Sequence, residues 1–336
     1  MAIYYLHTKS ISRTAGRSAT AAAAYRAGER IRDERTGVLH NHSRRRDVNH
    51  AEILLPSRLS IPEGHWARDR SALWNAAEAA EHRRDSRVAR EIQVSLPVEL
   101  SATQRLVLAR TFAQELADRH NVAIDLTIHE PRPEGDVRNH HAHLLATSRE
   151  LHETGFGGKA GLDLPYSEQI KRGLCKGRNE LIMIRERWAT LTNEAFRAAG
   201  IDERVDHRSL KAMGVNREPM PHIPYFAYKL ERRGMRSEVA QHIRENYRSR
   251  LAARAALGQP TDAFGPRIPS PESSAVDIED MRRRSRAAWL RLRGEALQRN
   301  AEHSAAASQD RAFNHTQAQP VAAPDLATDS ESEFDL

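Results

Sequence analysis

The chain has 336 residues, of which 39% are hydrophobic, and this length suits one large domain or one domain with appendages. No run of 18 apolar residues occurs, so no membrane insertion is expected, and the first residues lack the apolar stretch of a secretory signal. The single cysteine, Cys175, excludes an internal disulfide, a thiolate zinc finger and an iron–sulfur cluster, and it fits a reducing cytoplasm.

The charge is distributed unevenly along the chain. Residues 300–336 hold seven acidic residues and one arginine, so residues 1–299 carry a net charge of +13 within the total of +7. The strongly basic charge of residues 1–299 favours nucleic acid or another polyanion as a partner. The alternative is a basic surface that is only solvated and binds no specific partner. Net charge alone indicates an affinity for polyanions and does not indicate a reaction.

A strand and a short helix are the first predicted elements. Residues 2–9 alternate apolar and polar side chains, which predicts a strand. Residues 18–28 predict a helix, because Ser18 can cap it, alanines fill it and Gly28 can end it. Tyr25 is the one bulky side chain in that helix, and taken alone it fits an ordinary half-buried aromatic best.

The middle of the chain alternates between loops, helices and strands. Residues 30–50 are rich in charge and histidine, and Gly37 indicates a turn or a loose loop. Apolar spacing then predicts a helix at 65–83, a strand at 90–96, and helices at 101–118 and 178–199. In the strand, Ile92 belongs to the face that points to the core, and Glu91 belongs to the opposite face.

The segment 121–150 predicts a β-hairpin, because the runs IDLTIH and HAHLLA alternate and are separated by prolines and a glycine. His141 and His143 lie two residues apart on one strand, so they share a face at a separation of roughly 7 Å. His129 closes the opposite strand, where cross-strand pairing can bring it beside them. Three converging imidazoles predict a metal site with open coordination positions. Coincidence is the alternative, since the chain has 17 histidines; His140, for example, is expected to face the other side of the strand.

The composition changes toward the C-terminus. Residues 226–275 predict a helical segment and a Pro/Gly linker. Residues 276–300 predict a basic helix that could bind DNA or dock on a partner, and residues 301–336 predict a disordered acidic tail. For residues 1–225 we expect an α+β fold, with a central antiparallel sheet and helices packed on one face.

A metal on a sheet face, a basic body and a tyrosine on a small-residue helix together indicate phosphodiester chemistry. A bound metal could neutralise charge that develops on a phosphate. A tyrosine phenolate is a competent nucleophile, and the phosphotyrosyl intermediate keeps the ester's energy for religation. The alanines around Tyr25 are expected to leave the helix surface bare, so that a DNA backbone can approach the hydroxyl.

Over about residues 1–225 the chain resembles the MobA/MobL family of plasmid mobilisation relaxases, members of the HUH endonuclease class. The stretch AIYYLHTKSISRTAGRSATAAAAYRAGERI is similar to the family's opening strand and nucleophile helix, and the family's catalytic tyrosine falls on Tyr25. In the family's histidine motif, one histidine ends a strand and Asn-Pro-His-x-His follows. This motif falls on His129 and on residues 139–143, where His140 replaces the proline.

Glu91 matches an active-site carboxylate of the family, and a second acidic position of the family is Gln93 in this chain. The resemblance implies that Glu91 orients a histidine or helps to deprotonate Tyr25. A surface carboxylate in a salt bridge is the alternative for Glu91.

The resemblance implies a site- and strand-specific nicking enzyme that initiates conjugative mobilisation. Tyr25 would attack the scissile phosphate at the origin of transfer, oriT, and stay joined to the DNA 5′ end, and the reverse reaction would religate the strand. His129, His141 and His143 would hold a divalent ion: ligand softness favours Mn²⁺ or another transition ion, and cellular availability favours Mg²⁺.

The implied partners are single-stranded or supercoiled plasmid DNA at oriT, relaxosome accessory proteins and the coupling protein of a type IV secretion system. The sequence contains no GxxxxGK(S/T) motif, so unwinding and export are expected to depend on those other proteins. We expect the protein in the bacterial cytoplasm, and in the recipient cell when it is exported covalently attached to DNA.

The sequence is also compatible with two other functions. One is a rolling-circle replication initiator of the same HUH class, which would use the same tyrosine chemistry at a replication origin. The other is a noncatalytic DNA-binding protein whose histidines hold a structural metal. An exposed Tyr25 argues against the second rival, because a structural metal site needs no such tyrosine.

Overall fold

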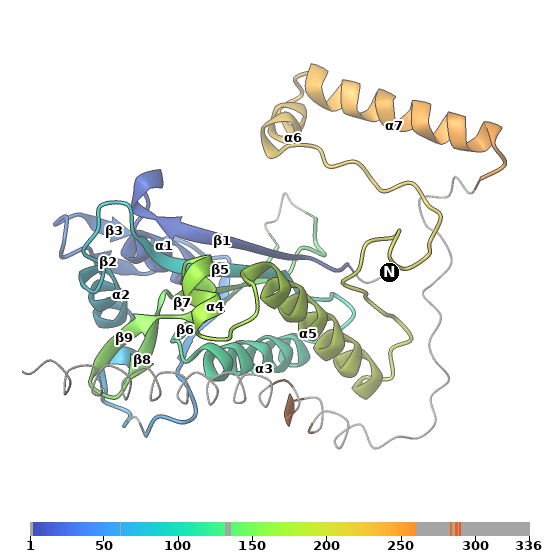
Figure 1. The fold of residues 1–336 in the computed structure, drawn as a ribbon. Helices are drawn as coiled ribbons and strands as arrows, with labels where there is room; N and C mark the ends of the chain where they lie inside the picture. The colour runs from blue at the N-terminus through green and yellow to red at the C-terminus, as the bar shows by residue number, and fades with distance from the viewer. Residues whose placement is uncertain are drawn as a thin grey trace, which may run out of the picture.

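The computed structural model describes residues 3–60, 62–131 and 136–259, together with Arg283, Arg286, Ala287 and Trp289. A twisted sheet runs through the centre of the molecule, with helices packed against it (Figure 1). Its five strands are arranged in the order β1-β5-β7-β6-β4, and every neighbouring pair is antiparallel. The predicted α+β class with a central antiparallel sheet is therefore confirmed. The strands are β1 (Leu6–Ser12), β4 (Val48–Leu54), β5 (Arg87–Ser95), β6 (Ile124–His129) and β7 (His141–Thr147).

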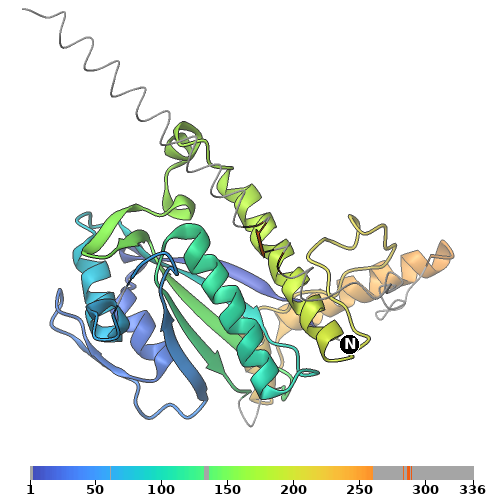
Figure 2. The same cartoon turned by 90° about the horizontal axis from the view of Figure 1, so that it is seen from below.

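One face of the sheet is covered by α3 (Ala102–His120) and α5 (Gly177–Ala198), close to their predicted ranges. Figure 2 shows α3 lying along this face with α5 beside it. A capping box formed by Ser101 and Gln104 starts α3. The rings of Phe112 and Trp188 join the two helices at a centroid distance of 4.9 Å. Aliphatic side chains from alternate positions of the strands complete this part of the core.

The other face of the sheet is covered in part by α1 (Ala19–Ala27) and α2 (Arg70–Ala79), so the expectation of helices on one face only was wrong. Helices pack on this second face because it carries both apolar side chains and buried polar ones. Buried Asp125 of β6 accepts hydrogen bonds from Arg70 and from the indole of Trp74, which fasten α2 to the strand. Ser18 caps α1, and Gly28 ends it at a φ of 68°, a conformation that glycine adopts without strain.

The alanines of α1 do not form a bare outer surface, which corrects that expectation. Ala19, Ala22, Ala23, Ala24 and Ala27 are all buried. Their small side chains allow α1 to pack closely beside α2 and the sheet. The alanine run therefore serves mainly to place the helix, and Tyr25, 44% exposed, lies on its outer side.

Several short elements were not predicted from the sequence. The charged segment 30–50, for which only a turn or a loose loop at Gly37 was predicted, forms the hairpin of β2 and β3 and the start of β4, and Gly37 lies in the connection between β2 and β3. Residues 205–224 contain no helix or strand, and α6 and α7 correspond to the predicted helical segment, with α6 starting one residue before it. The further elements are β2 (Arg30–Arg32), β3 (Leu39–Asn41), β8 (Arg149–His152), β9 (Gly155–Lys159), α4 (Tyr166–Lys171), α6 (Tyr225–Arg232) and α7 (Glu238–Ala256), with 3-10 turns at Arg13–Ala15, Trp66–Arg68 and Gly161–Asp163.

The predicted basic helix lies mostly outside the described residues, and the predicted acidic tail lies wholly outside them. Of the basic helix, Trp289 is helical and buried, and its ring stacks on Arg119 at 3.8 Å. Among the helices of the described part of the chain, none is both long enough and apolar enough to cross a membrane.

Candidate active site

The three histidines of the hairpin meet on one face of the sheet, as the sequence predicted. His129 ends β6 and is the direct cross-strand partner of His141, which begins β7, and His143 follows two residues later on the same face. The three ring centroids are 4.7 to 5.3 Å apart. Each ring offers one nitrogen, and these nitrogens lie within 4.8 Å of one another. His140 is not part of this cluster.

Each of the three imidazoles uses one ring nitrogen in a hydrogen bond to an oxygen. His129 Nε2 lies 2.8 Å from the carbonyl oxygen of Arg26, His141 Nδ1 lies 2.9 Å from that of Asn139, and His143 Nδ1 lies 2.6 Å from the carboxylate of Glu91. Such an acceptor fixes the tautomer, because the bonded nitrogen carries the proton and the other nitrogen keeps its lone pair. The donor set therefore fits a divalent metal ion.

The environment keeps two of these histidines neutral. Burial lowers the pKa of His129 to about 4. Burial also lowers the pKa of His143, although the hydrogen bond to Glu91 opposes the shift. Only a neutral imidazole has a lone pair for a metal, so both rings are in the state that ligation requires near neutral pH.

Glu91 is buried on the same face of the sheet, behind His143. Its carboxylate contacts Arg26 Nε at 2.6 Å and Lys9 Nζ at 2.8 Å, in addition to His143. Burial alone would raise the pKa of Glu91, but the hydrogen bonds from His143 and Arg26 outweigh it and lower the pKa. Glu91 is thus a charged anchor for His143, and the sequence correctly placed it on the polar face of its strand.

Tyr25 stands at the edge of the same site, near the C-terminal end of α1. The guanidinium of Arg45 lies 4.2 Å from the centre of its ring, and Arg45 Nη1 donates a hydrogen bond to the Tyr25 carbonyl oxygen. The ring of His42 meets Tyr25 edge-on at 5.2 Å. These contacts hold the phenol in place while its outer side stays exposed.

Arg45 is a site residue that sequence reasoning missed, because it is the middle one of three consecutive arginines, at 44–46, and little in the sequence distinguishes it from the other two. Its guanidinium pairs with Asp47, whose pKa the hydrogen bonds from Arg45 lower to about 2. Arg45 Nη2 also lies 3.4 Å from His129 Nδ1, so one side chain links Tyr25 to the histidine cluster. The only local signal is the acidic residue two positions after Arg45.

Tyr25 and the three histidines line one pocket of about 660 Å³. The exposed aromatic residues Tyr5 and Tyr228 also line it, and Gln93 projects into it beside His143. A candidate nucleophile, three candidate metal ligands and two further exposed aromatic side chains therefore share one opening.

The sequence profile of the MobA/MobL family matches residues 17–233, a range that contains Tyr25, Glu91 and all three histidines. The chain belongs to the MobA/MobL family. It is 39% identical over 280 residues to the mobilization protein MobL of Acidithiobacillus ferridurans, covering 77% of this chain and 71% of that protein. It is 32% identical to the conjugal transfer protein TraA of Rhizobium radiobacter, where the match covers 74% of this chain but 24% of TraA.

A solved structure from work on the molecular basis of vancomycin resistance transfer in Staphylococcus aureus is also similar. It is 31% identical, with a TM-score of 0.52, and the match covers 62% of this chain and 99% of that one. The family assignment and this likeness confirm the resemblance inferred from the tyrosine helix and the histidine hairpin.

Proposed function

We propose that this chain is a relaxase that nicks one strand of plasmid DNA at the origin of transfer and later religates it. The observation that carries the proposal is the pocket that Tyr25 shares with His129, His141 and His143. A purely structural metal site would not need an exposed tyrosine at its rim. The relatives named for mobilization and conjugal transfer favour transfer over replication as the process served.

In this proposal the hydroxyl oxygen of Tyr25 attacks the phosphorus of the scissile phosphodiester. A bond forms between that oxygen and phosphorus, and the bond from phosphorus to the 3′ oxygen breaks. The Tyr25 hydroxyl gives up its proton to solvent and the 3′ oxygen takes one up to leave as a hydroxyl, so the number of protons is unchanged. Tyr25 then carries the 5′ phosphate of the DNA. The reverse reaction re-forms the strand, because the phosphotyrosyl ester retains the energy of the bond that was broken.

His129, His141 and His143 would hold a divalent ion, Mn²⁺ or Mg²⁺, each through one ring nitrogen. When bound, such an ion supplies a positive charge for a non-bridging phosphate oxygen. Arg45 would hold the Tyr25 ring next to this cluster.

Glu91 acts in this scheme as a positioning residue for His143. Of the two roles that the sequence left open, orienting a histidine is favoured over deprotonating Tyr25, because the lowered pKa makes Glu91 a weak base. Its carboxylate is also occupied by Lys9 and Arg26 as well as His143.

The proposed reaction also implies partners and a location. Accessory proteins of a relaxosome would expose the single strand, and the coupling protein of a type IV secretion system would export it. The nicking step would take place in the bacterial cytoplasm. The covalent bond to Tyr25 would carry the protein into the recipient cell with the strand.

The test is a nicking assay with Mn²⁺ and labelled single-stranded oligonucleotides tiled across the transfer region of the plasmid that carries the gene. The proposal expects one oligonucleotide to form a covalent adduct, and Tyr25→Phe to abolish it, with Tyr166→Phe as the matched control. His143→Ala should abolish nicking and keep salt-sensitive DNA binding, whereas His140→Ala should keep both. The absence of an adduct with every oligonucleotide would sink the proposal.

A further inference from the structure

We call the pocket of about 660 Å³ that holds the three histidines the histidine pocket. A second hollow, of about 850 Å³, also reaches Tyr25 but lies farther along β1, because Lys9 and Ile11 line it, whereas Ile3 and Tyr5 line the histidine pocket. We call it the arginine groove, because Arg13, Arg17, Arg26, Arg35 and Arg84 line it together with Lys9. Tyr25 is the one residue that lines both the arginine groove and the histidine pocket. A DNA strand whose phosphate lies at Tyr25 therefore has one of these hollows on each side.

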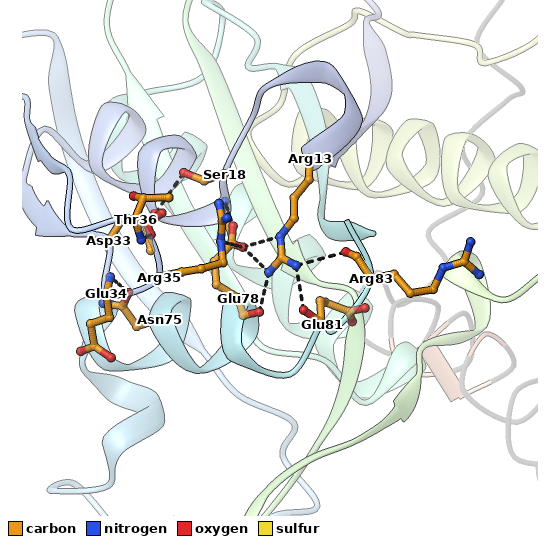
Figure 3. A network of polar contacts seen from close by, with 12 residues as sticks. Arg13, Ser18, Asp33, Glu34, Arg35, Thr36, Asn75, Glu78, Glu81 and Arg83 are labelled. Carbon is orange, nitrogen blue, oxygen red and sulfur yellow. Dashed lines mark hydrogen bonds and ion pairs between the residues drawn. The ribbon is translucent and has the colours of Figure 1, made fainter. Parts of the chain in front are cut away.

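The carboxylates of Glu78 and Asp33, which lie next to the arginine groove, accept hydrogen bonds from neighbouring residues of the protein (Figure 3). Glu78, which is 1% exposed, accepts hydrogen bonds from Arg13 and from the backbone N–H of Ala19 at the start of α1. Asp33 accepts a hydrogen bond from the hydroxyl of Thr20 at 2.6 Å and one from the backbone N–H of Thr36. These carboxylates therefore contribute little free negative charge to the groove.

The cations of the groove fall into two groups. Arg13 is fully engaged, since it also donates to the backbone carbonyl oxygens of Glu78 and Glu81. By contrast, Arg17 and Arg84 are exposed, and within the described part of the chain no hydrogen bond or ion pair holds their guanidinium groups. Rigid walls with two uncommitted guanidinium groups make a built site for the phosphates of a DNA strand.

The two hollows differ in how they can bind DNA. The histidine pocket offers the exposed aromatic rings of Tyr5 and Tyr228, on which bases stack. Apart from Tyr25, no Phe, Tyr or Trp lines the arginine groove among the described residues. The groove therefore suits the sequence-independent backbone of DNA, and the histidine pocket suits bases.

We propose that the arginine groove holds the nucleotides on the 3′ side of the nick, through their phosphates and without reading their sequence. This inference rests on the nicking function proposed above. After nicking, the 3′-hydroxyl end has no covalent link to the protein, so it needs specific noncovalent contacts to remain available for religation. The other strand end is tethered by Tyr25 itself, so a nonspecific basic track is sufficient to guide it.

The test uses the oligonucleotide that the nicking assay identifies, in a long form with 12 nucleotides on the 3′ side of the nick and a short form with two. Binding is measured by fluorescence anisotropy with EDTA present, so that no cleavage occurs, over a range of salt concentrations. The variant is Arg17→Gln with Arg84→Gln. The matched control is Arg172→Gln with Arg178→Gln, which removes the same charge from exposed positions around α4 and α5.

The wild type should bind the long form more tightly than the short form, and scrambling the sequence on the 3′ side should not change this. In the groove variant the advantage of the long form should disappear, and the salt slope for the long form should fall by about 1.4, or about 0.7 for each lost phosphate contact. Binding of the short form and the behaviour of the control variant should follow the wild type.

Two results would overturn the inference: a groove variant that keeps the full advantage of the long form, or one that loses as much affinity for the short form as for the long form. Either result would leave the nicking function standing, because Tyr25 adducts would still form. If no oligonucleotide formed an adduct at all, the proposed function itself would fail.

Discussion

The central sheet presents two faces of opposite character, although the same strands build both. On one face, Leu126 and its alternate neighbours on β6 meet the apolar sides of α3 and α5. On the other face, Asp125 and His129 meet α1 and α2 through ion pairs and hydrogen bonds. Strand alternation thus separates a face whose role is packing from a face that carries polar chemistry.

The polar face of the sheet contains buried carboxylates, and each of them has partners that stabilise its charge. A buried charge is tolerated only with partners that satisfy it. Asp125 has Arg70 and Trp74, Glu78 has Arg13, and Glu91 has Arg26. Each carboxylate fixes a different element next to the tyrosine or the histidines, so the ion pairs of this face both stabilise the fold and align the site.

A large effect on stability is expected from breaking one of these pairs. Asp125→Asn keeps the shape of the side chain but removes the buried negative charge that pairs with the guanidinium of Arg70, whose side chain is 10% exposed. The free energy of unfolding should fall by about 3 kcal/mol, measured by urea denaturation. The control is Glu52→Gln on the opposite face, whose half-exposed pair with Arg110 should be worth less than about 1 kcal/mol. Equal losses from the two variants would contradict the comparison.

A substitution on the face that packs against α3 and α5 should lower the free energy of unfolding without changing the nicking reaction. Leu126 is fully buried and points away from the histidines, so Leu126→Ala should cost about 3 kcal/mol through lost burial and a cavity. The nicking rate per folded molecule should stay within a factor of about two of the wild type, because no site contact is removed. A large loss of nicking in protein shown to be folded by circular dichroism would break the separation of the two faces.

At Glu91 the distinctive change should appear in metal use, besides a loss of stability similar to that of Asp125→Asn, because Arg26 and Lys9 lose their charged partner. Glu91→Gln keeps a hydrogen-bond acceptor but weakens the orientation of His143, which should lower metal affinity about 10- to 100-fold. Mn²⁺ titration of the nicking rate measures this, and excess Mn²⁺ should restore most of the rate. A rate that no metal concentration restores would instead assign Glu91 a direct role in proton transfer.

The sequence allowed the locally determined parts of this molecule to be predicted. The histidine hairpin follows from alternation and turn residues within 30 positions, and the ends of α1 follow from Ser18 and Gly28. The position of α2 on the polar face depends on Asp125, 55 residues from Arg70, and no local pattern reveals such a pair. Strand β4 was missed because a half-buried edge strand carries a weak hydrophobic signal.

Arg45 shows the same limit within the site. Only the folded chain distinguishes it from its exposed neighbours Arg44 and Arg46, because its partners Tyr25 and His129 are 20 and 84 residues away. The hairpin pattern located the histidines, family resemblance singled out the tyrosine, and the tertiary contacts added the residue that connects them.

The most direct test of the central claim is to identify the amino acid that becomes joined to DNA. The covalent adduct from the nicking assay would be digested with nuclease and trypsin and then analysed by mass spectrometry. Trypsin cleaves after Arg17 and Arg26, so it releases residues 18–26, whose only tyrosine is Tyr25. The account predicts that this peptide carries the mass of a 5′-phosphonucleotide and that fragmentation places it on Tyr25. A nucleotide on any other peptide, or on Ser18 or Thr20 of this one, would contradict it.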